Sequence, residues 1–352
     1  MSKKLSKQKL NDIITYGIVI AAFVIMQILI NAGEISSLFQ GLMVPLCTYI
    51  ILAISLNLVV GILGELSLGH AGFMCVGAFT SSFFSKAMQD TITNSTVRFL
   101  LALLIGIITA AIFGIIIGIP VLRLNGDYLA IVTLAFGEII KNLVNVLFIG
   151  KDSKGFHFST KDAVSLNMGP DGKIILNGPQ GITGTPNDST FFIGFILILV
   201  TLFIVLNLIH SRDGRAIMAI RDNRIAAESI GINITKYKLM TFTISAAMAG
   251  AAGVLYAHNL SNLTANTNNF GYNMSINILV FVVLGGIGNI RGSIIAAVVL
   301  TLLPELLRGM SDYRMLIYAI VLIVMMLFNW APKAIEWREK HLSFKKNKKE
   351  AA

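Results

Sequence analysis

Ten apolar runs separated by polar stretches constrain the fold of this chain more than any other feature. They cover roughly residues 13–30, 42–61, 66–86, 98–119, 127–149, 191–210, 239–258, 275–288, 291–308 and 313–331. A transmembrane helix needs about 20 mostly apolar residues. Only 13% of the residues are charged, against about 25% in an ordinary soluble domain. The sequence therefore predicts an all-α, polytopic transmembrane helical bundle with about ten hydrophobic segments, and it argues against a soluble enzyme.

The third, eighth and ninth runs are interrupted by glycine or polar residues, so we expect these segments to be broken or only partly spanning. Non-helical backbone at membrane depth is stable only where it is buried in protein or lines a cavity. The first run follows four lysines but is long for a signal peptide, and no small-residue cleavage site follows it. We therefore expect it to be a retained span.

Lysine and arginine gather at both ends of the chain and in one internal segment, which predicts the orientation in the membrane. The net charge is +10, and basic residues beside apolar runs indicate the cytoplasmic side rather than nucleic-acid binding. Segment 211–238 carries six basic residues, whereas 31–41 and 259–274 carry none. We expect ten crossings of the inner membrane, with both termini and 211–238 in the cytoplasm and the long loop 150–190 outside.

The sequence lacks the motifs of the common catalytic and metal sites. It contains no GxxxxGK[ST] phosphate loop, no nucleophile elbow and no HExxH pair. Cys47 and Cys75 lie inside apolar runs, which favours free buried thiols over a disulfide. We therefore predict that this chain is not an enzyme and has no catalytic residue, no metal site and no cofactor of its own.

The first candidate site is the stretch 64–78, where ionisable residues and glycines interrupt apolar sequence. One interpretation is a broken helix that lines a translocation path, with Glu65, Ser67 and His70 facing water or substrate. The alternative is a tight helix–helix contact permitted by the glycines, with Glu65 at the level of the lipid headgroups. Ionisable residues in membrane segments are commonly functional, so both interpretations stay open.

The second candidate is Glu138, which lies about three turns into the run 127–149. An unpaired carboxylate at that depth costs several kcal/mol. Lys141 lies three residues further on the same helical face and is the expected local partner. Glu138 is therefore expected to belong either to a structural ion pair or to a wet cavity on the translocation path.

The third candidate is the stretch 285–293, which has four glycines in its first eight residues. This density predicts a helix break. Freed backbone around Gly286 and Asn289 could bind a ligand on the path. The alternative, which we favour slightly, is a tight cytoplasmic turn between two spans, with Arg291 at the inner edge of the membrane.

The fourth candidate is segment 211–238, which is expected to form an amphipathic helix that ends at Gly231. Its apolar residues 217, 220 and 225 alternate with charged ones. Such a helix could lie on lipid headgroups or dock into a groove of a partner protein. The mixed charges, among them Arg221 and Glu228, suit a protein groove better than an anionic membrane.

Together these motifs resemble the permeases of bacterial ATP-binding-cassette importers for branched-chain amino acids, the LivM type. The similarity extends over about residues 40–331 and keeps the order of the family's motifs. It rests on the stretches GELSLGHAGFMCVGAF (64–79), LRLNGDYLAIVTLAFGEI (122–139), NGPQGITGTP (177–186), GRAIMAIRDNRIAAESIGI (214–232) and VLGGIGNIRGS (283–293).

The resemblance implies partners: a second, similar permease subunit, two cytoplasmic ATPase subunits that bind the ATP, and an external solute-binding protein that largely selects the substrate. It also implies that 226–231 matches the Ala-Ala-x-x-x-Gly core of the importer coupling loop, which presses a short helix into a groove of the ATPase. The residues assigned to this coupling are Arg215, Arg221, Ala226, Ala227, Glu228 and Gly231.

The expected organisation is a cytoplasmic tail (1–12), a transmembrane permease domain (13–331) and a basic cytoplasmic tail (332–352), with the apolar surface in contact with membrane lipid. The expected function is import of hydrophobic amino acids by alternating access, driven by ATP on separate subunits. Three alternatives remain: the same machinery moving urea, short amides or another small solute; a secondary transporter whose proton relay is Glu65, His70 and Glu138; and an uncoupled channel or scaffold.

Overall fold

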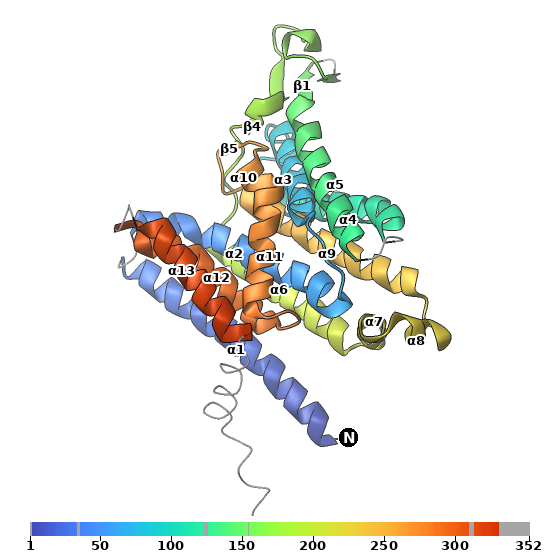
Figure 1. Ribbon diagram of the computed structural model, residues 1–352. Helices are drawn as coiled ribbons and strands as arrows, with labels where there is room; N and C mark the ends of the chain where they lie inside the picture. Colours follow the sequence, from blue (N-terminus) through green and yellow to red (C-terminus); the bar gives the residue numbers. More distant parts are fainter. Residues whose placement is uncertain (1, 34–35, 123–125, 154, 310–312, 331–352) are drawn as a thin grey trace, which may run out of the picture.

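The computed structural model describes residues 2–33, 36–122, 126–153, 155–309 and 313–330 and forms a bundle of helices with a small β region projecting from one end (Figure 1). Its main helices are α1 (Ser2–Asn31), α2 (Ser37–Asn57), η1 (Leu58–Leu63), α3 (His70–Ala87), α4 (Ser95–Val121), α5 (Asp127–Val146), α6 (Phe191–His210), α7 (Arg212–Asp222), α8 (Arg224–Ser229), α9 (Ile234–Ala257), α10 (Thr267–Phe270), α11 (Tyr272–Gly285), α12 (Ile290–Leu306) and α13 (Arg314–Trp330). Short 3₁₀ turns are η2 (Val164–Leu166), η3 (Gly178–Gln180) and η4 (Leu307–Gly309).

The helical, polytopic character predicted from the apolar runs is confirmed, whereas the number of ten spans is not. In the part of the chain that the structure describes, six helical stretches are long and apolar enough to cross a membrane: Asp12–Asn31, Phe39–Leu63, Ser95–Val121, Tyr128–Val146, Phe191–His210 and Ile234–Ala257. The other apolar helices, α3, α11, α12 and α13, have between 14 and 18 residues. These are the helices of the third, eighth, ninth and tenth runs.

The centre of the bundle is built from α2, α3, α4 and α9, and glycines let these helices approach closely. Almost every residue of α3 is buried. A side chain on Gly77 of α3 would collide with the backbone of Gly250 in α9, since its Cβ would lie 2.5 Å from the Gly250 Cα. Likewise, a Cβ on Gly253 would lie 2.1 Å from the Met74 carbonyl oxygen. The close contact proposed for the glycines of stretch 64–78 is therefore present.

The long loop 150–190 contains short strands that the sequence did not predict, so the all-α description needs this correction. Strand β1 (Phe148–Asp152) pairs antiparallel with β2 (Gly155–Ser159) and with β3 (Lys173–Asn177), in the order β2-β1-β3. Strand β4 (Ile182–Thr183) pairs with β5 (Asn262–Leu263). Such brief strands among turn-forming residues give too little alternation to recognise.

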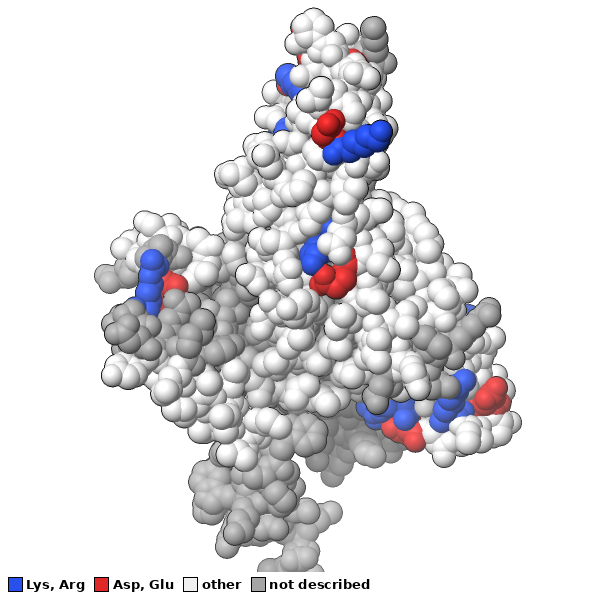
Figure 2. All heavy atoms as spheres, turned by 45° about the horizontal axis from the view of Figure 1, so that its top comes forward, with Lys and Arg blue, Asp and Glu red and all other residues white. Residues whose placement is uncertain are grey.

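Helix α6 joins this β region to α7 and α8, which project at the opposite end of the bundle (Figure 1). Figure 2 shows basic and acidic side chains gathered where α7 and α8 lie, on a surface that is otherwise largely uncharged. The prediction of a single helix over 211–238 is wrong. Extended backbone at Asn223 (φ −157°, ψ 105°) separates α7 from α8. The Asn223 side chain then caps α8 by accepting a hydrogen bond from the Ala226 N–H, 3.0 Å away.

The helix stop predicted at Gly231 is confirmed. Gly231 has φ +85°, a conformation that glycine adopts without steric cost. The Ile232 N–H donates to the Ala227 carbonyl (3.1 Å) and the Gly231 N–H donates to the Glu228 carbonyl (3.0 Å). These two bonds form a Schellman motif, which fixes the end of α8.

The amino-terminal helix begins at Ser2, so the predicted tail 1–12 is continuous with the first apolar run. The Asp12 carboxylate lies 3.4 Å from the His210 Nδ1 at the end of α6. This contact places the start of the apolar part of α1 at the same end of the bundle as α7. The basic tail predicted over 332–352 lies outside the described residues.

Candidate functional site

A break in the helical backbone lies between α2 and α3. Helix α2 continues into η1, a π-helix, which ends at Gly64 with φ +81°. Residues 64–69 are not helical, and α3 begins at His70. The broken helix predicted for this stretch is confirmed, and it falls at the start of the third run. Single π-turns within helices are frequent at functional sites.

Ser67 and His70 at the break are buried in this structure and do not face water, whereas Glu65 is partly exposed. The His70 ring nitrogen Nε2 lies 2.7 Å from the Ser55 hydroxyl, and the Ala71 N–H donates to the Ser275 hydroxyl (3.2 Å). Ser67 is fully buried, and its hydroxyl has no hydrogen-bond partner among the described residues. The break is thus tied to α2 and α11, and the contact interpretation fits His70 better than a wet path does.

Glu65 forms an ion pair with Lys238 of α9. The two side chains are 14% and 3% exposed, respectively. A charge this deeply buried needs a partner, because a lone charge in a low-dielectric environment costs several kcal/mol. Lys238 was counted among the basic residues that set the orientation and was not recognised as a site residue. Its position one residue before an apolar run was the available signal.

The break also packs against α5, which brings the first and second candidate stretches into contact. The Leu68 N–H donates to the Thr133 hydroxyl at 3.0 Å. A Cβ on Gly69 would lie 2.1 Å from the Thr133 carbonyl oxygen. A Cβ on Gly72 would lie 2.8 Å from the Gly137 Cα. Side chains at these two glycines would push the break away from α5.

The predicted pair of Glu138 and Lys141 is confirmed, with the Lys141 Nζ 2.5 Å from the Glu138 Oε2. The other carboxylate oxygen of Glu138 accepts a hydrogen bond from the Tyr272 N–H (2.8 Å) at the start of α11. Lys141 also donates to the Thr267 hydroxyl (3.2 Å). The pair therefore joins α5 to α10 and α11, which favours the structural ion pair over a carboxylate in a wet cavity.

The glycine-rich stretch 285–293 forms the predicted helix break as a tight turn between α11 and α12. Gly286 and Gly288 have φ values of +93° and +81°, and the exposed Asn289 caps α12 through the Gly292 N–H (3.3 Å). The Gly288 N–H donates to the side chain of Asn57 (2.9 Å).

Asn57 was not predicted as a site residue, although it is the only amide side chain in its apolar run. Its side-chain nitrogen donates to the Ser293 hydroxyl in α12, 2.8 Å away. The glycine turn is therefore held against the end of α2, just before η1. An amide within an apolar segment needs such partners, which was the signal that could have found it.

Two of the residues assigned to coupling make contacts within this chain. The Arg221 Nη1 donates to the Gly61 carbonyl in η1 (3.0 Å). Ala227 is 2% exposed and packs with Ile220 and Ile234. The Ala227 side chain therefore faces inward and does not lie on the outer surface of α8. The exposed members of the set are Arg215, Arg221, Ala226, Glu228 and Gly231.

The outward face of α8 instead presents Ile225 and Ile230, which are 81% and 75% exposed. Ile225 was recognised as part of the amphipathic pattern, but neither isoleucine was assigned to coupling. A large apolar side chain near each end of this short helix was the available signal.

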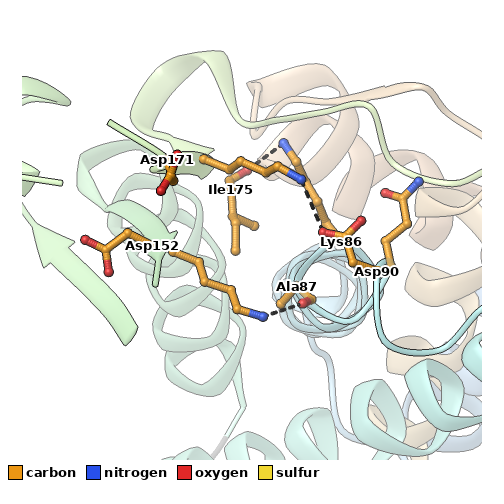
Figure 3. Close-up of a pocket in the computed structure, with 9 residues that line it drawn as sticks. Lys86, Ala87, Asp90, Asp152, Asp171 and Ile175 are labelled. Atoms are coloured by element: carbon orange, nitrogen blue, oxygen red, sulfur yellow. Dashed lines mark hydrogen bonds and ion pairs between the residues drawn. The ribbon is translucent and has the colours of Figure 1, made fainter. Parts of the chain in front are cut away.

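A polar pocket of about 230 Å³ lies at the opposite end, between the end of α3 and the β-sheet (Figure 3). Lys86 points into it and donates to the Thr183 carbonyl (2.7 Å), and Lys151 donates to the Ala87 carbonyl (3.0 Å). Lys173 pairs with Asp90 (3.2 Å). These basic groups fasten the sheet to the end of α3.

All four candidate stretches thus meet around the break between α2 and α3, although they are far apart in the sequence. Among the described residues, no group of three or more His, Cys, Asp and Glu side chains is arranged to hold a metal ion. The prediction that Cys47 and Cys75 are free and buried is confirmed. Broken helices tied together by buried polar contacts within a polytopic bundle are typical of membrane transport proteins.

Comparison with known families identifies the class more closely. Residues 38–328 match the family described as the permease component of branched-chain amino acid transport systems. The chain belongs to this family of transport permeases, which is not an enzyme class, and is a multi-pass membrane protein.

Characterised relatives cover most of the chain. It is 35% identical over 296 residues to the high-affinity branched-chain amino acid transport system permease protein LivM of Salmonella typhimurium, covering 82% of this chain and 67% of the relative. It is 25% identical to the fructose import permease protein FruG of Bifidobacterium longum (87% and 85% covered). It is 26% identical to LivH of Salmonella typhimurium (80% and 89% covered). No solved structure matches.

Proposed function

We propose that this chain is the transmembrane permease subunit of an ATP-binding-cassette importer that moves branched-chain amino acids across the inner membrane. Family membership supports transport, and α8 supports coupling to a separate ATPase. Two large apolar side chains exposed on one short, doubly capped helix are unfavourable in water and suit the groove of a partner protein. The single observation that carries the coupling is this exposed pair, Ile225 and Ile230.

The proposed partners are a second, similar permease subunit, two ATPase subunits and an external solute-binding protein. The relatives include both a LivM and a LivH permease protein from one organism, which supports pairing of two related permeases. The β region and the polar pocket of Figure 3 are the proposed contact for the solute-binding protein. Membrane lipid covers the apolar outer faces, such as the isoleucines of α4.

The proposed orientation has the amino terminus and α7–α8 in the cytoplasm and the β region outside. The pair of Asp12 and His210 supports one side for the start of α1 and for α7. The pairing of β4 with β5 supports a common side for 150–190 and 259–274. Single cysteines in 150–190 and 259–274 should react with an impermeant reagent added outside intact cells, and cysteines in 215–230 should not. Labelling within 215–230 would overturn the orientation.

The coupling face is tested by placing a charge on α8. Ile225→Asp and Ile230→Asp should each remove the ATPase subunits from the purified membrane complex, because an exposed apolar anchor becomes a buried lone charge in the groove. The matched control is Val164→Asp, which changes an equally exposed apolar residue (84%) at the other end of the molecule. ATPase pull-down that is normal in both isoleucine variants would contradict the proposed docking.

The substrate is tested by uptake in proteoliposomes that hold the complete complex and its solute-binding protein. We expect ATP-dependent uptake of labelled leucine, isoleucine and valine. The relative FruG, named for fructose import, supports testing urea, short amides and sugars beside them. Uptake of one of these solutes in preference to the amino acids would replace the proposed substrate.

The proton-driven alternative is supported less well, because each residue of its relay already has a partner. Glu65 pairs with Lys238, Glu138 pairs with Lys141, and His70 contacts Ser55. Uptake by the permease alone, driven by a proton gradient without ATPases, would favour this alternative.

A further inference from the structure

The α7–α8 segment is joined to the helix break by contacts on both of its sides. Before α8, Arg221 donates to the Gly61 carbonyl at 3.0 Å and lies against Gly64, where a Cβ would come within 2.6 Å of the Arg221 Cγ. After α8, Lys238 in the first turns of α9 pairs with Glu65. The residues before and after the proposed ATPase-binding helix therefore hold consecutive parts of the break.

Separating the groups that make these contacts is energetically unfavourable. Lys238 is buried, and its ion pair with Glu65 is at the same time a hydrogen bond from the ammonium group to the carboxylate. Separating the pair would leave a lone charge in a poorly solvated environment, which is costly. Because Gly64 has no side chain, Arg221 lies directly against the backbone there. A displacement of α7 and of the start of α9 would therefore carry residues 61–65 with it.

The other end of the break is bound to the core helices. The Leu68 N–H is held by Thr133 of α5 (3.0 Å), and the Ala71 N–H by Ser275 of α11 (3.2 Å). Between the two sets of contacts lies Ser67, whose buried hydroxyl has no partner among the described residues. An unpartnered buried hydroxyl is unfavourable, so an arrangement of this segment that gave Ser67 a partner would remove that cost.

We propose that Lys238 and Arg221 are positioning residues that transmit the movement of α7–α8 to the non-helical segment 64–69, and that this segment is the moving element of the translocation path. The inference rests on the proposed coupling of α8 to an ATPase and names the route by which the work reaches the membrane interior. The segment is contacted by α7 and α9 at one end and by α5 and α11 at the other, which gives the contiguous physical contact that transmission between sites uses.

Lys238→Met tests the link in the complete complex, reconstituted with ATPases and solute-binding protein. ATPase pull-down should be retained, because Lys238 is buried and lies outside α8. Uptake per ATP hydrolysed should fall about tenfold, within the usual range of coupling between sites. The matched control is Lys236→Met, which removes an exposed lysine two residues away and should transport normally. Normal uptake per ATP in Lys238→Met would overturn the proposal.

A buried Glu65 without a partner could prevent Lys238→Met from folding, so two further variants remove that charge or re-pair it. Glu65→Gln with Lys238→Met leaves no lone charge and should assemble, yet remain uncoupled. The exchange Glu65→Lys with Lys238→Glu restores the ion pair and should recover uptake per ATP. An assembled neutral variant that couples like the wild type would show that the pair only supports the fold.

Movement of the segment is read directly by labelling at Leu66, which is 37% exposed. Leu66→Cys is introduced after Cys47 and Cys75 are replaced by Ser or Ala. The labelling rate should differ at least about fivefold between nucleotide-free and ATP-bound complex, at the low end of coupled two-state changes. Adding Lys238→Met should abolish this difference. A rate that never responds to ATP would overturn the moving-element assignment.

The two proposals fail in different ways. If α8 does not dock an ATPase, Ile225→Asp keeps the ATPases bound and coupled. If α8 docks but the link is absent, Ile225→Asp loses the ATPases while Lys238→Met transports with normal uptake per ATP.

Discussion

Two regions of the bundle each bury a carboxylate beside a lysine, and they differ in the distance between the partners along the chain. In α5, Glu138 and Lys141 are three residues apart and lie on one helical face. At the break, Glu65 and Lys238 come from separate elements on the two sides of α7–α8. The first pair was predicted from spacing, whereas the second was not.

The difference indicates different roles. The local pair is completed by Tyr272 and Thr267, so it fastens α5 to the start of α11 at a fixed place. The long-range pair connects a segment of irregular backbone to the first turns of α9, directly after the proposed coupling helix. Disrupting the first pair is therefore expected to change assembly, and disrupting the second is expected to change the coupling of transport to ATP hydrolysis.

The largest expected effect is that of Glu138→Lys, which places two positive charges side by side where the carboxylate was. An uncompensated buried charge costs about 3–5 kcal/mol, so little folded protein should accumulate in the membrane. Glu138→Gln is the control, because its side-chain oxygen can still accept from the Tyr272 N–H, and it should assemble. Immunoblotting of membranes measures how much of each variant accumulates, and thermal unfolding of the purified complex measures its stability. Normal accumulation of Glu138→Lys would mean that the site is solvated.

Lys141→Met should have the next largest effect. It leaves Glu138 with the Tyr272 N–H alone, and a cost of about 2 kcal/mol is expected, below that of a fully buried pair because Glu138 is a quarter exposed. Thermal unfolding should show the loss, while uptake per ATP of the assembled complex should stay normal. The two lysine variants should therefore differ: Lys141→Met lowers stability, whereas Lys238→Met lowers uptake per ATP. A drop in uptake per ATP equal to that of Lys238→Met would erase the distinction between the two regions.

Gly69→Ala tests the contact that joins the two regions. Its Cβ would lie 2.1 Å from the Thr133 carbonyl oxygen, so α5 and the break would have to separate, at a cost of about 1–3 kcal/mol for overpacking. The matched control is Gly41→Ala in α2, whose Cβ would meet nothing within 4 Å. Differential scanning of the two variants should show a lower Tm only for Gly69→Ala. Equal Tm values would mean that the two regions do not depend on each other.

Thr133→Val is expected to have the smallest effect. The substitution keeps the shape of the side chain and removes the acceptor of the Leu68 N–H, a loss of about 1 kcal/mol for one hydrogen bond. A small reduction in Tm is expected, together with faster hydrogen exchange at Leu68, and Thr133→Ser should retain both properties. Unchanged exchange at Leu68 in Thr133→Val would show that another group accepts this bond.

The sequence predicted best where neighbours in the chain decide the structure. The apolar runs predicted the helices, the glycine density predicted the breaks near residues 64 and 286, Gly231 predicted the end of α8, and Lys141 predicted the partner of Glu138. Each depends on the period of one helix or on the conformation of one residue. The motif resemblance covered 40–331, and the family match covers 38–328.

The predictions from the sequence failed where contacts between distant elements decide the structure. The number of spans was not confirmed because α11 and α12 are short helices joined by a tight turn, and a run of apolar residues does not show how far a helix crosses. The strands around residue 150 depend on pairing between separated segments. The inward position of Ala227 depends on Ile220 and Ile234, which α8 meets only after the chain turns at Asn223.

By itself, the sequence determined that this chain is a helical membrane protein and where its helices bend, because hydrophobic length and backbone conformation are local properties. Its motifs supplied the resemblance to the permeases. Only the tertiary structure decided that the four separate motifs meet at one break, that Lys238 neutralises Glu65, and that Ile225 and Ile230 face outward. Partner choice for a buried charge follows from which side chains are within reach, and residues 173 positions apart come within reach only when the bundle has packed.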